Sequence, residues 1–241
     1  MRCAYDCQNA LGRLCDERVY ENDLARRLRS EGFREVHSQV PITMSHGRFH
    51  KEYRLDLLAD DALYELKTVT AFTSEHDAQI LHYAMLLSVN HGKLLNFRNM
   101  SVEGRLRCNA VLTETRQCVT CDATRWQPLS LHCADLMQHT KAILHDWGSF
   151  LDFRLYEEAL VFHFGGEGHA SIRSPLTLDG IQLGTHRFCL HDTITSFMVT
   201  GFSDAESQRS HVQRLLKFSG FNAMQWLNFH HSSVRFTTLT R

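Results

Sequence analysis

The apolar residues of the first half of the chain follow two periods, one helical and one typical of strands. Residues 10–31 show the helical period, with one apolar stripe between polar faces: Leu14, Val19, Leu24 and Leu28. Gly32 is placed to end this helix. Residues 37–44, 53–60 and 62–69 alternate or run apolar over lengths that suit strands. The pattern predicts a helix followed by three strands.

A second helix and two more strands complete this region. Residues 74–90 return to helical spacing, and residues 93–97 and 105–112 are short apolar stretches of strand length. The order helix, three strands, helix, two strands predicts a mixed α/β domain, to which we assign residues 1–113.

The rest of the chain divides into a connector and a repeat of the first domain. Residues 114–148 contain one helical pattern, over residues 130–147, and we interpret them as a connector. In residues 149–241 several stretches of the first domain return in the same order and at a nearly constant separation: Tyr20-Glu21 as Tyr156-Glu157, EHDAQILHY as SHVQRLLKF, and KLLNF as QWLNF. Such self-similarity predicts an internal duplication.

The composition is that of an ordinary globular protein. The chain has 241 residues, of which 43% are hydrophobic and 22% charged, and its formal net charge is −1. This charge argues against a protein that coats nucleic acid, although a nuclease can concentrate positive charge along one cleft. Apolar runs are too short to cross a bilayer, and the N-terminus lacks the apolar core of a secretory signal. We therefore expect a cytoplasmic protein with no membrane partner.

The chemistry of the first domain centres on two acids and a lysine. Asp56 lies in YRLDLLAD, and Glu65 and Lys67 lie in the next predicted strand, where the period of two puts them on one face. Two carboxylates that share a pocket need a cation, and oxygen ligands favour Mg²⁺ or Mn²⁺. In the alternative interpretation Asp56 begins a turn and Glu65 and Lys67 form a surface pair on an edge strand.

The segment around these residues resembles the GxxExxY proteins of the PD-(D/E)XK nuclease superfamily. The resemblance covers about residues 10–112, through LGRLCDERVYENDLARRLRSEGF, QVPI, YRLDLL, YELKTV, HDAQILHYAMLL and GKLLNF. Glu17 and Tyr20 meet the motif that names the family. Leu14 stands where its glycine is expected, and Gly12 matches the other glycine usual in that loop. The resemblance implies a restriction-endonuclease-like fold, a divalent metal and a nucleic-acid substrate.

The resemblance also implies roles for individual residues. Asp56 and Glu65 would bind the metal, Lys67 would be the catalytic lysine, and an acid of the first helix, Glu17 or Glu21, would complete the site. Gln79 and Tyr83 match a Q-x3-Y pair that faces the site in RecB-like members. For Glu17 and Glu21 the alternative is an exposed helical face, and for Gln79 and Tyr83 it is helix packing.

The predicted second copy lacks this chemistry. Alignment of the two copies puts other residues opposite the acids, the lysine and the helical pair: Cys189 for Asp56, Met198 for Glu65, Thr200 for Lys67, Arg214 for Gln79 and Phe218 for Tyr83. Only the helical acid Glu157 is kept. Methionine does not bind Mg²⁺ and cysteine is a poor ligand for a hard ion, so we interpret residues 149–241 as a degenerate pseudo-nuclease.

Three roles are open for a degenerate copy. We favour packing against the first domain as an intramolecular stand-in for a dimer partner. The copy can instead widen a nucleic-acid groove, for which the candidates are Arg187, Arg209, Arg214 and Lys217. A slight excess of acidic residues in the second half does not support that groove. The third role is binding of a protein partner, and the sequence does not show whether two chains pair.

The cysteines give the weakest signal. Cys118 and Cys121 have the spacing of a metal-binding pair, but no second pair is suitably spaced for zinc, and the intervals do not fit an iron–sulfur cluster. Eight cysteines in a cytosolic chain of this size fit free thiols.

Three functions follow, in order of preference. The first is a Mg²⁺- or Mn²⁺-dependent nuclease, with DNA preferred to RNA as its substrate and its active site in the N-terminal half only. The second is a non-catalytic nucleic-acid-binding or protein-interaction protein built on a nuclease fold. The third is a zinc-dependent interaction module centred on the segment CVTC.

Overall fold

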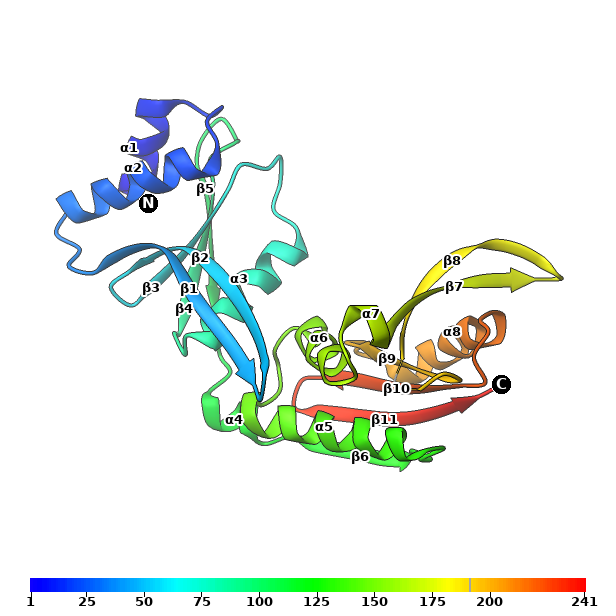
Figure 1. Cartoon of the computed structure of the whole chain (residues 1–241). Coiled ribbons are helices and arrows are strands. Elements are labelled where there is room, and N and C mark those ends of the chain that lie inside the picture. The colour runs from blue at the N-terminus through cyan, green and yellow to red at the C-terminus, as the bar shows by residue number, and fades with distance from the viewer. Residues whose placement is uncertain (191) are drawn as a thin grey trace. The chain divides into compact units, whose positions relative to one another are not determined.

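The structure, a computed structural model, describes residues 1–190 and 192–241 and contains two units. The first unit comprises Met1–Ser45 and His50–Leu112, and the second comprises His46–Phe49 and Thr113–Arg241. Both are mixed α/β structures, each built around one sheet (Figure 1). No helix of the described residues is long and apolar enough to span a membrane.

The first unit has the predicted order of elements, preceded by an extra helix. Its elements are α1 (Arg2–Leu11), α2 (Glu17–Ser30), β1 (Val36–His46), β2 (Phe49–Ala59), β3 (Ala62–Lys67), α3 (Ser74–Leu86), β4 (His91–Asn96) and β5 (Glu103–Cys108). The strands follow one another across the sheet in chain order. β3 pairs with β4 in parallel, whereas β2–β3 and β4–β5 are antiparallel. The parallel pair requires a crossover, and α3 supplies it.

The predicted helix over residues 10–31 is wrong in its first part. α1 ends at Leu11, Gly12 takes a left-handed conformation with φ 72°, and α2 begins only at Glu17. Leu14 lies in the connecting loop with 76% of its surface exposed, and Val19 is 42% exposed. Tyr20, Leu24 and Leu28 form the buried face instead. The break redirects the chain, and the apolar stripe therefore starts later than the spacing predicts.

Apolar side chains cover both faces of this sheet. One cluster joins α1 and α2 to the strands through Tyr20, Leu24, Leu57, Leu66 and Phe97, among others. The opposite cluster joins α3 through Leu55, Leu63, Ile80, Tyr83 and Leu94. Leu55 and Leu57 are both buried, but in different clusters, although residues two apart normally share a face. The alternation of β2 therefore breaks at Asp56.

The second unit includes the whole stretch interpreted as a connector. Its elements are α4 (Thr113–Gln117), β6 (Thr120–Arg125), α5 (Leu131–Trp147), α6 (Phe153–His163), α7 (Glu167–Ala170), β7 (Ser171–Leu178), β8 (Ile181–Leu190), β9 (Thr195–Thr200), α8 (Ala205–Phe218), β10 (Ala223–His230) and β11 (Ser233–Thr240). The predicted helix over residues 130–147 is confirmed as α5. The strand β6 was not predicted, and it joins the sheet by pairing in parallel with β11. Residues 114–148 are thus part of the second unit by their contacts.

Apart from β6, the second sheet repeats the strand order of the first. Its order is β6-β11-β10-β9-β8-β7. β9 and β10 pair in parallel with α8 between them in the chain, as β3 and β4 do with α3. The neighbouring pairs β8–β9 and β10–β11 are antiparallel, as in the first unit.

Specific hydrogen bonds also recur in the two units. The Tyr20 hydroxyl donates to the Gly12 carbonyl at 2.8 Å, and the Tyr156 hydroxyl donates to the Gly148 carbonyl at 2.7 Å. Both glycines have φ 72° and cap the preceding helix. α5 therefore occupies the place of α1, which means that the matching region starts before residue 149. The duplication stays a prediction, and it accounts for these shared contacts.

A buried asparagine makes a second recurring contact. Asn96 pairs in the ladder with Lys67, and its side chain bonds to both the N–H and the carbonyl of Val69. Asn228 pairs with Thr200 and bonds in the same way to Phe202. Each asparagine fixes the chain where it leaves the central strand, so its function is in the fold.

The two tyrosines provide a matched test of stability. We expect Tyr20→Phe and Tyr156→Phe each to lower the free energy of unfolding by about 1–2 kcal/mol, because each leaves a carbonyl at a helix end without its donor. Denaturant unfolding of the two variants and the wild type measures this loss. Unchanged stability in both variants would show that neither hydroxyl fixes its glycine turn.

Candidate active site

The candidate site forms where β2 separates from β3. The two strands pair only from Leu57–Tyr64 to the hairpin end. Beyond that pair the Leu66 N–H lies past the end of the ladder, and the Asp56 carboxylate accepts its hydrogen bond at 2.8 Å through Oδ2. Asp56 thus replaces a strand partner at the point where the alternation of β2 breaks. Its carboxylate is held beside Glu65 by the chain itself.

Glu65 and Lys67 share one face of β3, as the period of two predicts. Lys67 Nζ donates to Glu65 Oε1 at 2.7 Å. Glu65 is only 2% exposed, and its second oxygen, Oε2, is buried without a hydrogen-bond partner among the described residues. A buried carboxylate oxygen without a partner is costly, and a cation would remove that cost. The alternative of a surface pair on an edge strand is wrong, because β3 lies between β2 and β4.

The charges of the site shift one another's ionisation. Burial, assisted by the negative charge of Asp56, raises the pKa of Glu65 from 4.5 to about 7. Burial also raises the pKa of Asp56, against the effect of its bond to Leu66. Burial alone would lower the pKa of Lys67, but the charge and hydrogen bond of Glu65, with the charges of Asp56 and Glu17, together outweigh it and the pKa is raised. Lys67 therefore carries its positive charge at neutral pH.

The two helical acids lie close enough to affect Asp56. Glu17 and Glu21 are both among the charges that raise its pKa, after burial. Glu17 Oε1 accepts from the N–H of Thr68 at 3.0 Å. Glu21 is 3% exposed, so for this residue the exposed-face interpretation is wrong. Neither acid has a direct partner among Asp56, Glu65 and Lys67 in the described hydrogen bonds and ion pairs.

Gln79 and Tyr83 lie one turn apart on α3 and bond to each other. Gln79 Nε2 donates to the Tyr83 hydroxyl at 3.2 Å. Burial raises the pKa of Tyr83, and the charge of Glu65 raises it further. Tyr83 also belongs to the apolar cluster under α3. It therefore serves helix packing and lies within electrostatic reach of the acids.

Gln39 is the site residue that the sequence reasoning missed. Its Nε2 donates to Glu21 Oε2 at 2.7 Å, while Arg18 Nη1 donates to Glu21 Oε1 at 2.7 Å. Both oxygens of Glu21 are thus occupied. Gln39 has φ 54°, a left-handed conformation that is strained for a residue other than glycine. The signal available was its place at the head of QVPI, a segment quoted only as a strand.

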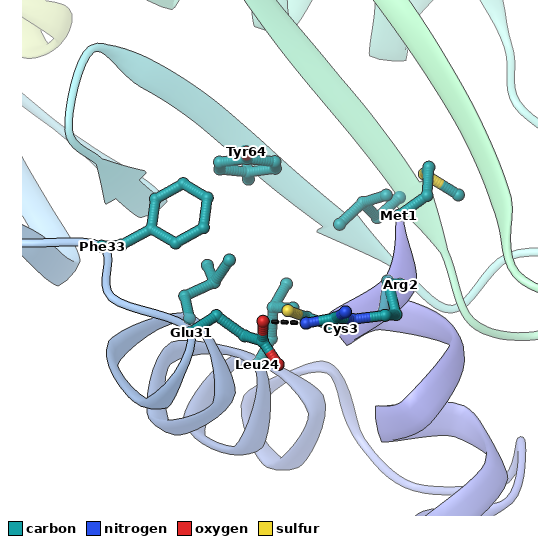
Figure 2. A pocket seen from close by; sticks show the side chains of 10 residues that line it. Met1, Arg2, Cys3, Leu24, Glu31, Phe33 and Tyr64 are labelled. Atoms are coloured by element: carbon teal, nitrogen blue, oxygen red, sulfur yellow. Dashed lines mark hydrogen bonds and ion pairs between the residues drawn. The ribbon is translucent and has the colours of Figure 1, made fainter.

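The pocket on the other side of the sheet is separate from these acids. It measures about 270 Å³ and is lined by residues of α1, α2 and the adjoining strands: Met1, Arg2, Cys3, Ala4, Leu24, Leu28, Glu31, Phe33, Tyr64 and Leu95. Figure 2 shows Arg2 and Glu31 joined by an ion pair at this pocket, with the rings of Phe33 and Tyr64 on its far side. Tyr64 adjoins Glu65 on β3, and the alternation of side chains directs the two to opposite faces.

The corresponding place in the second unit is neutralised by an arginine. Arg187 Nη1 donates to Glu157 at 2.8 Å, and its Nη2 donates to Glu167 at 2.6 Å. Met198 pairs with Trp226 as Glu65 pairs with Leu94, and this register agrees with the alignment of Met198 with Glu65. The first unit has an ion pair at the matching helical acid too, between Arg18 and Glu21, but it adds Asp56, Glu65 and Lys67.

The alignment of Cys189 with Asp56 is wrong by one residue. Cys189 pairs with Phe197 in the second sheet, and Leu57 pairs with Tyr64 at the matching place in the first. Leu57 is therefore the counterpart of Cys189. Phe188 packs on the α8 side as Leu55 packs on the α3 side. If the two units are copies, Asp56, where the alternation breaks, has no counterpart among the described residues of the second unit.

The described residues contain no group of three or more His, Cys, Asp or Glu side chains arranged to hold a metal ion. The candidate site offers two carboxylates, and Cys118 and Cys121 are exposed free thiols. Mg²⁺ commonly keeps several waters and takes only one or two protein carboxylates, so Asp56 and Glu65 suit it.

Comparison with known families finds a match, and it lies in the first unit. Residues 1–108 match the PD-(D/E)XK nuclease superfamily. The matched segment ends with β5 and includes Asp56, Glu65 and Lys67. No curated protein and no solved structure matches the chain. The PD-(D/E)XK match supports a nuclease, and the roles of individual residues stay predictions.

Proposed function

We propose that the first unit is a divalent-metal-dependent nuclease that hydrolyses phosphodiester bonds of DNA, with RNA as the alternative substrate. One observation carries this proposal. A buried carboxylate, Glu65, whose Oε2 has no partner among the described residues, and the half-buried carboxylate of Asp56 adjoin a lysine within the segment that matches the nuclease superfamily. A structural ion pair alone would need only one of these acids.

Asp56 and Glu65 are the residues that would hold Mg²⁺ or Mn²⁺. When bound, the metal lowers the pKa of a water molecule and offsets charge on the scissile phosphate. The Leu66 N–H holds Asp56 through Oδ2, which leaves Oδ1 for a ligand. Glu65 likewise has Oε2 available, since Lys67 donates to Oε1.

Lys67 is the proposed catalytic cation. Its ammonium group has more donors than its bond to Glu65 uses, so it can also donate to a phosphate oxygen or orient the attacking water. The raised pKa of Lys67 keeps it protonated, which suits charge stabilisation rather than proton abstraction. Gln79 and Tyr83 are proposed to position the substrate beside it.

Gln39 and Glu21 have a proposed positioning role. The Gln39 amide holds one oxygen of Glu21 and Arg18 holds the other, which orients a carboxylate whose charge affects Asp56. The strained backbone at Gln39 is consistent with this, because strain persists where surrounding structure requires it.

We expect Gln39→Met to raise the Mg²⁺ concentration needed for half-maximal cleavage by about 10-fold, because ligand-orienting partners contribute about that much to metal affinity. Activity at saturating Mg²⁺ should change much less. Cleavage rates measured over a Mg²⁺ titration test this. Arg26→Met, on the same helix as Glu21 but paired with Asp23, is the control. A Mg²⁺ dependence equal to that of the wild type would contradict the positioning role.

The second unit is proposed to be non-catalytic. Asp56 lacks a counterpart there, Met198 stands for Glu65, and Glu157 is paired with Arg187. These residues do not provide the pair of unengaged carboxylates that a hard cation requires.

The direct test is incubation of labelled single- and double-stranded DNA and RNA with the full chain, in Mg²⁺, Mn²⁺ or EDTA. We expect metal-dependent cutting, with products resolved by gel electrophoresis. Intact substrates under every metal condition would leave the non-catalytic binding protein as the better interpretation.

A further inference from the structure

The second unit has a hollow lined only by basic and amide side chains. It measures about 390 Å³, and Gln213, Arg214, Lys217 and Arg241 line it. The first three lie on α8, and Arg241 follows β11. Three exposed cations with no acid in the same lining attract an anion to the hollow.

Backbone carbonyls hold these side chains in place. Arg241 Nη2 donates to the Lys217 carbonyl at 2.9 Å, and Arg214 Nε donates to the Ser210 carbonyl at 3.2 Å. Gln213 Nε2 donates to the Thr240 carbonyl at 2.6 Å. Each guanidinium keeps further N–H groups that these bonds do not use. The donors are thus partly ordered before any ligand binds.

These cations differ from most arginines of the second unit that lie near acidic side chains. Several of those arginines form ion pairs with carboxylates: Arg125 and Arg209 with Glu206, Arg154 with Asp152, Arg187 with Glu157 and Glu167, and Arg235 with Asp122. Within the described residues, no ion pair with a carboxylate is formed by Arg214, Lys217 or Arg241. Uncompensated positive charge therefore gathers in this hollow.

We propose that the hollow binds the phosphodiester backbone of a nucleic acid. Guanidinium groups match phosphate oxygens in geometry, and the ammonium of Lys217 adds a mobile charge. A backbone offers evenly spaced anions that several cations can contact together. The choice of nucleic acid as the anion rests on the proposed nuclease function. Binding of an anion in the hollow does not itself require that the first unit is catalytically active.

This proposal changes the set of groove candidates drawn from the sequence. Arg187 and Arg209 are engaged by glutamates and drop out. Arg214 and Lys217 remain, and Arg241 joins them. The degenerate copy would then hold the substrate although it does not cut it.

Binding of fluorescent single- and double-stranded DNA to the full chain, measured by anisotropy in EDTA over a series of salt concentrations, tests the hollow. The test variant is R214Q/K217Q/R241Q. Each cation removed should weaken binding roughly 5- to 10-fold at about 0.1 M salt and lower the salt slope by about 0.7–0.9. The control R125Q/R209Q/R235Q removes the same charge from ion-paired positions and should lose less affinity and less slope.

The single variant Lys217→Gln guards against misfolding, because the Lys217 side chain makes no hydrogen bond or ion pair among the described residues. Its salt slope should fall by about 1, the value expected for the loss of one phosphate contact. Equal losses in the test and control variants, no loss in either, or no binding by the wild type would overturn the proposal. Metal-dependent cleavage by the wild type with unchanged binding by the test variant rejects the hollow and leaves the nuclease standing. Weakened binding by the test variant, together with no cleavage by the wild type, rejects the nuclease and leaves the binding hollow standing.

Discussion

Asp56→Asn and Lys67→Met are each expected to lower metal-dependent cleavage by at least about 10³-fold. Asparagine removes a charge that would bind the metal, and methionine removes the cation that would stabilise the phosphate oxygens. Both substitutions nearly preserve side-chain size. Initial rates on labelled DNA at saturating Mg²⁺ measure the effect, because saturation separates catalysis from metal affinity.

The control for these variants is Glu157→Gln in the second unit. Glu157 is aligned with Glu21 but lies in the unit that lacks the acids and the lysine, so its loss should leave the cleavage rate within about 3-fold of the wild type. If Asp56→Asn and Lys67→Met cut as fast as the wild type, the acids and lysine are not the catalytic groups. If Glu157→Gln alone loses activity, catalysis belongs to the second unit.

The strands of the first unit, and the acids and lysine that lie on β2 and β3, could be predicted from the sequence. The period of two in ALYELK fixes Glu65 and Lys67 on one face of β3, and the structure pairs them at 2.7 Å. The position of Asp56 beside them also follows, because β2 and β3 are adjacent antiparallel strands. Local periodicity is enough where neighbouring strands follow each other in the chain.

The features that escaped prediction depend on the backbone or on distant partners. The left-handed turn at Gly12 breaks a pattern that the apolar spacing alone continues through Leu14. The strand β6 forms by pairing with β11, which lies more than a hundred residues later in the chain. Gln39 acquires a role through its bond to Glu21 on another element. None of these partners can be deduced from spacing along the chain.

The position opposite Asp56 in the second copy shows why residue-by-residue alignment failed. Letters align without gaps in YRLDLLAD and HRFCLHDT, so Cys189 falls on Asp56. The strand pairing instead makes Cys189 equivalent to Leu57, because Cys189 pairs with Phe197 as Leu57 pairs with Tyr64. A break in strand alternation changes the register by one residue, and the sequence pattern does not reveal it. The acid therefore marks an irregularity of the strand as well as the site's chemistry.

Glu65→Gln is expected to stabilise the metal-free protein at about pH 8 relative to the wild type, by at most about 3 kcal/mol, because the loss of the charge beside Lys67 offsets part of the gain. The pKa of Glu65 is about 7 in the folded protein, against an ordinary value of 4.5. The folded state thus disfavours the ionised carboxylate, which destabilises the wild type as pH rises from 4.5 and fully above 7. Denaturant unfolding in EDTA at a series of pH values measures the difference, which should vanish below about pH 4.5.

Mg²⁺ should reverse this order, because the metal binds the ionised form of Glu65 and glutamine supplies a weaker ligand. Adding Mg²⁺ at about pH 8 is expected to stabilise the wild type by the usual linkage to ligand binding and Glu65→Gln much less. An effect of pH without an effect of Mg²⁺ would mean that the acid is buried for another reason. A Glu65→Gln variant less stable than the wild type in EDTA at about pH 8 would show instead that the ion pair with Lys67 outweighs burial. Since the same carboxylate sets both responses, the two titrations separate a metal site from a structural ion pair without relying on cleavage.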